Sequence, residues 1–150
     1  MCRLYEKIDI LICVSGMFQM MKYIVKREEY VWMAFLDELE SLGVDTREGL
    51  ERVMGDESLY EMMFGIFLST IESAPITLSE FDSWDLEGLI GKVHSLKGTT
   101  GNLSITPLFT KYTEALNLLR ENRAAEARMV YADMIPTQTA IINCIRRYQG

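Results

Sequence analysis

One apolar repeat limits the folds open to this chain more than any other feature of its sequence. Between residues 85 and 103, apolar side chains and one threonine recur at alternating intervals of three and four residues: Leu86, Leu89, Val93, Leu96, Thr100 and Leu103. Such a repeat is typical of one side of an α-helix that packs in a bundle. The alternation of apolar and polar residues that marks strands does not occur in the chain. The repeat therefore predicts a helix from Asp85 to Leu103 within an all-helical fold.

The segments before this helix carry signals for three further helices. The first is expected to end at Gly43, because glycine favours the C-cap of a helix. A short second helix follows, with Asp45 or Thr46 as its N-cap, and the third begins at the N-cap Asp56 and ends before Pro75. We expect the core face of the third helix to comprise Leu59, Met62, Met63, Ile66, Phe67 and Thr70.

Two helices are expected after the central one. Pro107 suits the first turn of the next helix, and Pro136 should kink the last helix because proline removes one backbone hydrogen bond. The next helix also has an apolar face, formed by Ile105, Leu108, Tyr112, Ala115, Leu116 and Leu119. Together these elements predict one all-α domain over residues 31–150: an antiparallel four-helix bundle with additional N-terminal helices.

Residues 1–30 do not share this pattern. The segment IDILICVSGMF at 8–18 is apolar, but Asp9 interrupts it, and the segment is too short to span a bilayer. No small-residue cleavage site follows it, so a membrane or export role is disfavoured. Two explanations stay open: either the start at Met1 lies too early, or residues 1–30 form a loosely packed extension. In both cases we expect residues 1 to about 20 to be dispensable.

Composition excludes several classes of function. Charged residues make up 25% of the chain and hydrophobic residues 49%, as in ordinary globular proteins. The net charge of −7 argues against nucleic-acid binding, which needs clustered Lys and Arg. The three cysteines, Cys2, Cys13 and Cys144, form no C-x-x-C pair, and the chain has one histidine. The sequence therefore predicts no metal site and reduced thiols in the cytoplasm.

The single histidine, His94, lies on the polar side of the central helix, about 130° from the centre of the apolar repeat. Lys97, Gly98 and Gly101 share its face. Each glycine costs a helix about 1 kcal/mol relative to alanine, so the open surface around His94 should serve a purpose. A neutral imidazole is a nucleophile, and a neighbouring lysine can compensate a dianionic group on the ring. This arrangement favours a phosphoryl acceptor over a general base.

The sequence HSLKG at 94–98, followed by Gly101, Asn102 and Leu103, resembles the signature of histidine-containing phosphotransfer (HPt) domains. The segment at 43–68 is similar to the one that precedes this signature in free-standing bacterial HPt proteins, and the resemblance covers about residues 35–148. It implies a phosphorelay intermediate, which accepts a phosphoryl group from an aspartyl phosphate of one receiver domain and passes it to another. It further implies no kinase or hydrolase activity and no cofactor, with Mg²⁺ on the receiver.

The resemblance also implies roles for single residues. His94 would be phosphorylated, Lys97 would contact the phosphoryl oxygens, and Gly98 would keep the ring accessible. Met33 and Phe35 of the first helix are further candidates for an apolar patch, although burial in the bundle is favoured. The partners would be receiver domains of response regulators and hybrid histidine kinases, and the protein would be a cytoplasmic monomer that contacts neither membrane nor nucleic acid. The residues expected to contact the partner are Ile90, Gly91 and Gly101.

The chain departs from the family pattern at two positions. Ser104 stands where many relatives have glycine, and Leu116 stands where several present a glutamine to the histidine. Stabilisation of a phosphohistidine should therefore rest more on Lys97, with Lys111 or water as candidate substitutes. Two alternative functions remain open: a module that binds receivers without phosphotransfer, and a structural helical adaptor, which would not need the glycines.

Overall fold

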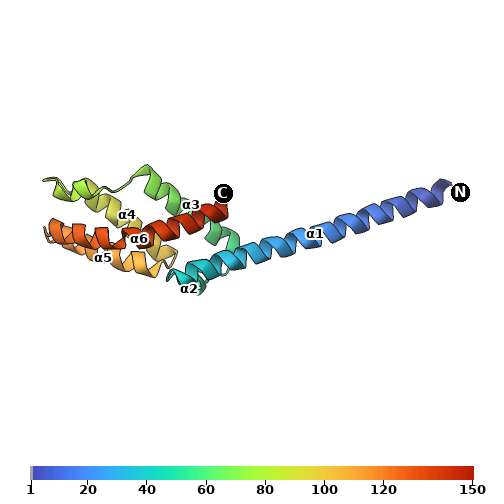
Figure 1. Ribbon diagram of the computed structural model, residues 1–150, viewed down its shortest axis with the longest axis horizontal. Helices are drawn as coiled ribbons and strands as arrows, with labels where there is room; N and C mark the ends of the chain where they lie inside the picture. Colours follow the sequence, from blue (N-terminus) through green and yellow to red (C-terminus); the bar gives the residue numbers. More distant parts are fainter. Residues whose placement is uncertain (1) are drawn as a thin grey trace. The chain divides into compact units, whose positions relative to one another are not determined.

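The computed structural model describes residues 2–150, with side chains from Gly16 onwards. Over this range the chain forms helices and no strands, so the predicted all-helical fold is confirmed for the described residues. In chain order the elements are α1 (Cys2–Ser41), α2 (Thr46–Arg52), α3 (Glu57–Ser73), the 3₁₀ helix η1 (Leu78–Asp82), α4 (Glu87–Asn102), α5 (Thr106–Arg120) and α6 (Ala124–Gln149) (Figure 1).

The chain divides into two compact units, residues 1–36 and residues 37–150, with the boundary inside α1. In the first unit, several large apolar side chains are exposed, among them Phe18 and Met21. None of the helices with described side chains is long and apolar enough to cross a membrane. The expectation that residues 1 to about 20 are dispensable falls largely outside the residues with described side chains.

The two tryptophans differ sharply in exposure. Trp32, in the first unit, is 8% exposed and packs against the Phe35 ring with 5.7 Å between the ring centroids. Phe35 is buried as favoured above, whereas Met33 is exposed. Trp84 lies in the second unit, between η1 and α4, and is 97% exposed. Each unit therefore contains one tryptophan, and only that of the first unit is shielded from solvent.

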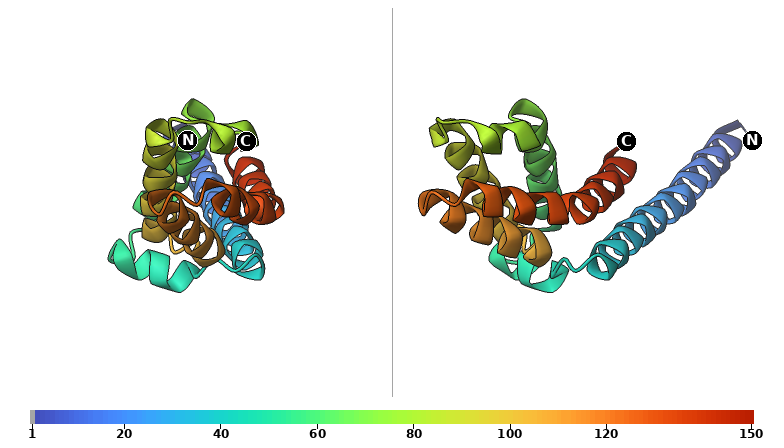
Figure 2. Two further views of the ribbon diagram at one scale, coloured as in Figure 1. Left: turned by 90° about the vertical axis from the view of Figure 1, so that its left-hand side faces the viewer. Right: turned by 60° about the vertical axis from the view of Figure 1, so that its left-hand side comes forward.

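The second unit is organised around α4, α5 and α6. α5 contacts α4 on one side and α6 on the other, η1 lies on α6, and α3 contacts both α4 and α6 (Figures 1 and 2). The apolar repeat of α4 faces inwards as predicted: Leu89, Val93, Leu96, Thr100 and Leu103 are buried, and Leu86 is half-buried. Because the buried repeat sets the orientation of α4 about its own axis, it also determines which side chains of α4 face solvent.

The core face of α3 differs from the predicted one. The buried residues are Tyr60, Phe64 and Phe67, whereas Leu59, Met62 and Ile66 of the predicted face are exposed. Aromatic rings bury more apolar surface than Leu, Met or Ile, so their burial is favoured. The Tyr60 hydroxyl can enter the core because it donates a hydrogen bond to the Leu103 carbonyl oxygen at 2.9 Å. Only Phe67 of the predicted face is fully buried.

The end of α1 and the starts of α2 and α3 form as their local sequences predict, whereas α4 is shorter than predicted, from Glu87 to Asn102. Gly43 has a φ of +90° after the end of α1, and the Val44 amide donates to the Leu39 carbonyl oxygen at 3.1 Å, as in a Schellman motif. Of the two candidate N-caps of α2, Asp45 is the one used: its carboxylate accepts a backbone hydrogen bond at 2.9 Å. Asp56 caps α3 with the same geometry, at 2.9 Å.

Pro107 and Pro136 occupy different positions in their helices. Pro107 lies in the first turn of α5, where its missing N–H costs no helical hydrogen bond. Pro136 lies inside α6, which continues as one helix from Ala124 to Gln149. The ribbon of α6 changes direction along its length (Figure 2), as expected for a helix that contains a proline.

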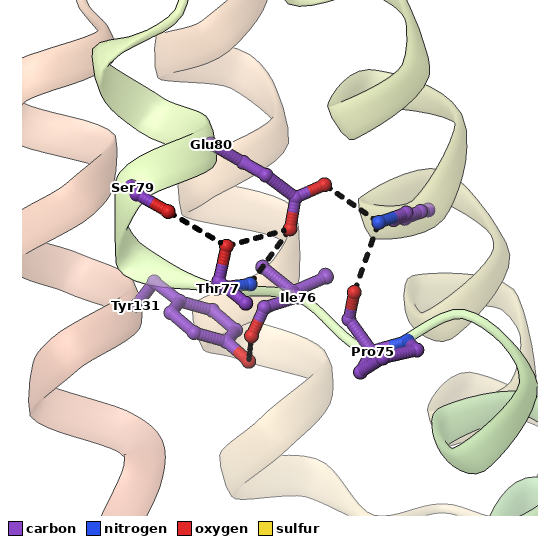
Figure 3. A network of polar contacts seen from close by, with 7 residues as sticks. Pro75, Ile76, Thr77, Ser79, Glu80 and Tyr131 are labelled. Atoms are coloured by element: carbon purple, nitrogen blue, oxygen red, sulfur yellow. Dashed lines mark hydrogen bonds and ion pairs between the residues drawn. The ribbon is translucent and has the colours of Figure 1, made fainter.

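A polar network ties the segment before α4 to the helices around it (Figure 3). The Lys92 ammonium on α4 donates to the Glu80 carboxylate at 2.6 Å, and the Thr77 amide donates to the same carboxylate at 2.7 Å. These contacts, that of Lys92 first, hold the pKa of Glu80 below its usual range. From α6, the Tyr131 hydroxyl donates to the Ile76 carbonyl oxygen at 3.3 Å. The segment between α3 and α4 is thus held by side chains of both α4 and α6.

Candidate functional site

His94 lies near the middle of α4 and is exposed, whereas its neighbour Val93 is fully buried. The prediction of an exposed histidine on this helix is confirmed. The cause is the inward-facing apolar repeat, which leaves the opposite side of α4 for polar and small residues.

An open groove of about 530 Å³ runs beside His94. Side chains and backbone from α2, from α4, from the turn after α4 and from α5 form its walls. The groove brings together four of the six residues that were predicted for the site: His94, Lys97, Gly98 and Gly101. The remaining lining residues are Glu48, Arg52, Asn102, Ser104, Thr106 and Phe109.

The other two predicted site residues lie outside the groove. Ile90 is half-buried and Gly91 is exposed, both on α4 before His94. Neither is among the residues that line the groove. A contact between Ile90 or Gly91 and a partner therefore stays a prediction.

Lys97 is half-buried within the groove, one turn after His94. Its ammonium lies 6.0 Å from the centroid of the Phe109 ring, at the outer limit of a cation–π contact. In the part of the chain with described side chains, no ion pair involves Lys97. Its positive charge is therefore available to an anion that enters the groove.

The two glycines of the groove have different surroundings. A Cβ atom at Gly98 would meet nothing within 4 Å, so this position is open surface. A Cβ atom at Gly101 would lie 3.0 Å from the Phe109 ring, which therefore needs a glycine beneath it. Gly101 was expected to keep the surface open, whereas it allows the partly exposed Phe109 ring to lie against α4.

Lys111 and Leu116 do not enter the groove. Leu116 is buried in the core, and the Lys111 ammonium forms an ion pair with Asp133 at 2.8 Å. The contact with Asp133 raises the pKa of Lys111. Lys111 is thus engaged with α6, and the structure gives no support to it as a substitute for the missing glutamine.

Arg52, from α2, is a groove residue that the sequence analysis missed. Its guanidinium donates to the Glu48 carboxylate at 2.6 Å and, through Nε, to the Ser104 hydroxyl at 3.2 Å. The spacing of Glu48 and Arg52 indicates a pair on one helix. No pattern in the sequence, however, indicates that α2 lies beside the turn after α4.

The groove can support nucleophilic chemistry at an imidazole. It combines an exposed ring with a cation one turn away and a glycine that leaves room for a second molecule. Among the residues with described side chains, no group of three or more His, Cys, Asp or Glu residues could hold a metal ion. A protein-family model that matches the chain was not found, and comparisons with curated proteins and with solved structures gave no match either.

Proposed function

We propose that the protein is a phosphorelay intermediate of two-component signalling, with His94 as the residue that carries the phosphoryl group. The observation that carries this proposal is the exposed His94 on a groove shared with Lys97 and Gly98. The resemblance of residues 94–103 to the HPt signature supports it. The proposal includes an antiparallel four-helix bundle of α3, α4, α5 and α6, and a cytoplasmic monomer whose partners are receiver domains.

In the proposed reaction, the unprotonated ring nitrogen of His94 attacks the phosphorus of an aspartyl phosphate on the receiver. A P–N bond forms, the P–O bond to the aspartate breaks, and the aspartate leaves as a carboxylate. The other ring nitrogen keeps its proton throughout. Transfer to a second receiver reverses these steps. Because the transition state of phosphoryl transfer is loose, positioning and charge compensation dominate, and Lys97 and the receiver's Mg²⁺ would supply the charge.

The decisive experiment is phosphate transfer in vitro. The purified protein is mixed with phosphorylated receiver domains of its host and Mg²⁺, with the His94→Gln variant as control. We expect acid-labile label on the wild-type protein and none on the variant, and no label when ATP is supplied without a receiver. Labelling by ATP alone, or equal labelling of the variant, would contradict the proposal. Receiver binding without any label on the wild type would indicate a docking module instead.

A further inference from the structure

Part of the groove wall is formed by α2 and by the turn after α4. Arg52 is held there by two contacts, at 2.6 Å to Glu48 and at 3.2 Å to the Ser104 hydroxyl. Ser104 lies in the turn after α4, beyond the end of the helix that carries His94. The guanidinium thus lines the groove from α2, where a protein that enters the groove to reach His94 can contact it.

The contacts of Arg52 leave it able to bind another acceptor. A guanidinium has five N–H donors, and the two described hydrogen bonds use two of them. The Arg52 and Glu48 side chains are 50% and 46% exposed, and exposed ion pairs contribute little to stability. Replacing the Glu48 carboxylate by a carboxylate of another protein therefore costs little.

Ser104 adopts a backbone conformation that is unusual for its residue type. Its φ is +55°, in the left-handed region that residues other than glycine rarely occupy. It is also buried, and its hydroxyl accepts the Arg52 hydrogen bond. A glycine would fit this backbone without strain but would offer Arg52 no hydroxyl. The serine thus supplies Arg52 with a hydrogen bond that a glycine could not.

We propose that Arg52 is a docking residue that pairs with a carboxylate of the receiver domain and so helps to select which receiver reaches His94. This inference rests on the proposed function. The local charge of the groove supports it: although the chain carries a net charge of −7, the groove lining holds two cations, Lys97 and Arg52, against one carboxylate, Glu48. In this arrangement Glu48 competes with the partner for Arg52.

The test compares two arginines of α2. Arg52→Gln and Arg47→Gln remove the same charge from the same helix, but Arg47 does not line this groove. The probe is a purified receiver domain that phosphorylates the wild-type protein. We expect Arg52→Gln to raise the KM for this receiver about tenfold and to weaken its salt dependence, and Arg47→Gln to change the KM less than about twofold. The maximal transfer rate and the phosphohistidine half-life should stay unchanged in both.

A third variant separates docking from a structural role. Glu48→Gln removes the competitor for Arg52, so it should lower the KM by about two- to threefold. If the ion pair only stabilised α2, Glu48→Gln and Arg52→Gln would both raise the KM, and the inference would be wrong. It would also be wrong if Arg52→Gln behaved like Arg47→Gln. If no receiver phosphorylates the wild type, the proposed function itself fails and this inference with it.

Discussion

Gly98 and Gly101 lie about one turn apart on α4, yet their surroundings predict opposite responses to a side chain. Gly98 faces open space, so an added side chain meets no steric resistance and the helix gains the better propensity of a residue other than glycine. At Gly101, an added Cβ would push on the Phe109 ring at 3.0 Å and displace an aromatic side chain of the groove. At the residue scale, then, a stable fold and an open site place conflicting demands on position 98.

The variant Gly98→Leu tests this conflict. The free energy of unfolding should rise by up to about 1 kcal/mol, because leucine is a better helix former than glycine. Transfer from a receiver to His94 should nevertheless slow, since the leucine fills part of the groove. Thermal unfolding and the labelling assay measure the two effects.

A matched control is Gly88→Leu on the same helix. Gly88 also faces open space but does not line the groove, so transfer should be unaffected. Its gain in stability should be smaller, because Gly88 lies in the first turn of α4. Normal transfer in Gly98→Leu would show that this glycine is not needed for access.

At the scale of single elements, α4 and α3 show when an apolar pattern predicts the buried face. Apart from Ile90, polar and small residues fill the other sides of α4, so its repeat favours one rotation of the helix, and His94 was correctly predicted to be exposed. α3 carries apolar residues on most of its sides. The spacing of these residues therefore does not indicate whether the face of Phe64 or that of Met62 is buried. The size of the aromatic rings and the hydrogen bond of Tyr60 decide the burial there, and both depend on tertiary packing.

The pH dependence of stability should reveal the contact between Glu80 and Lys92. Because the folded-state pKa of Glu80 is lowered, its carboxylate stabilises the fold above the usual carboxyl range, and this contribution disappears as the pH falls through the lowered pKa. Glu80→Gln should therefore cost about 1 kcal/mol or less at pH 7, and the cost should shrink in acid.

Urea unfolding at a series of pH values measures this difference. Glu61→Gln serves as control, since Glu61 is exposed and no ion pair is described for its side chain. A cost of Glu80→Gln that is the same in acid and at pH 7 would contradict the assigned role of the carboxylate.

At the scale of the whole molecule, the sequence predicts the helices and the histidine face but not how separate elements meet. Local signals fix the ends of α2 and α3, and the cap residues Asp45 and Asp56 were identified correctly. The position of Arg52 beside the turn after α4 depends on tertiary packing, which leaves no periodic pattern in the sequence. For the same reason, the sequence gives no sign of the ion pair between Lys111 and Asp133, which engages this lysine outside the groove.

Removal of residues 1–20 tests the division of the chain. A chain that begins at Met21 retains the whole unit 37–150, so its melting temperature should stay within about 2 °C of the full-length value. Leu39→Ala in the full-length chain is the control for sensitivity, because Leu39 is fully buried and its truncation should cost about 2–5 kcal/mol. A large drop for the shortened chain would show that residues 1–20 stabilise the fold.

The unequal exposure of the two tryptophans makes their fluorescence separable. The indole of Trp84 is open to a water-soluble quencher such as iodide, whereas that of Trp32 is shielded. Trp84 belongs to residues 37–150 and Trp32 to residues 1–36, so the quenchable and the protected parts of the fluorescence come from different units. Emission spectra recorded with and without iodide therefore distinguish the two indoles without any added label.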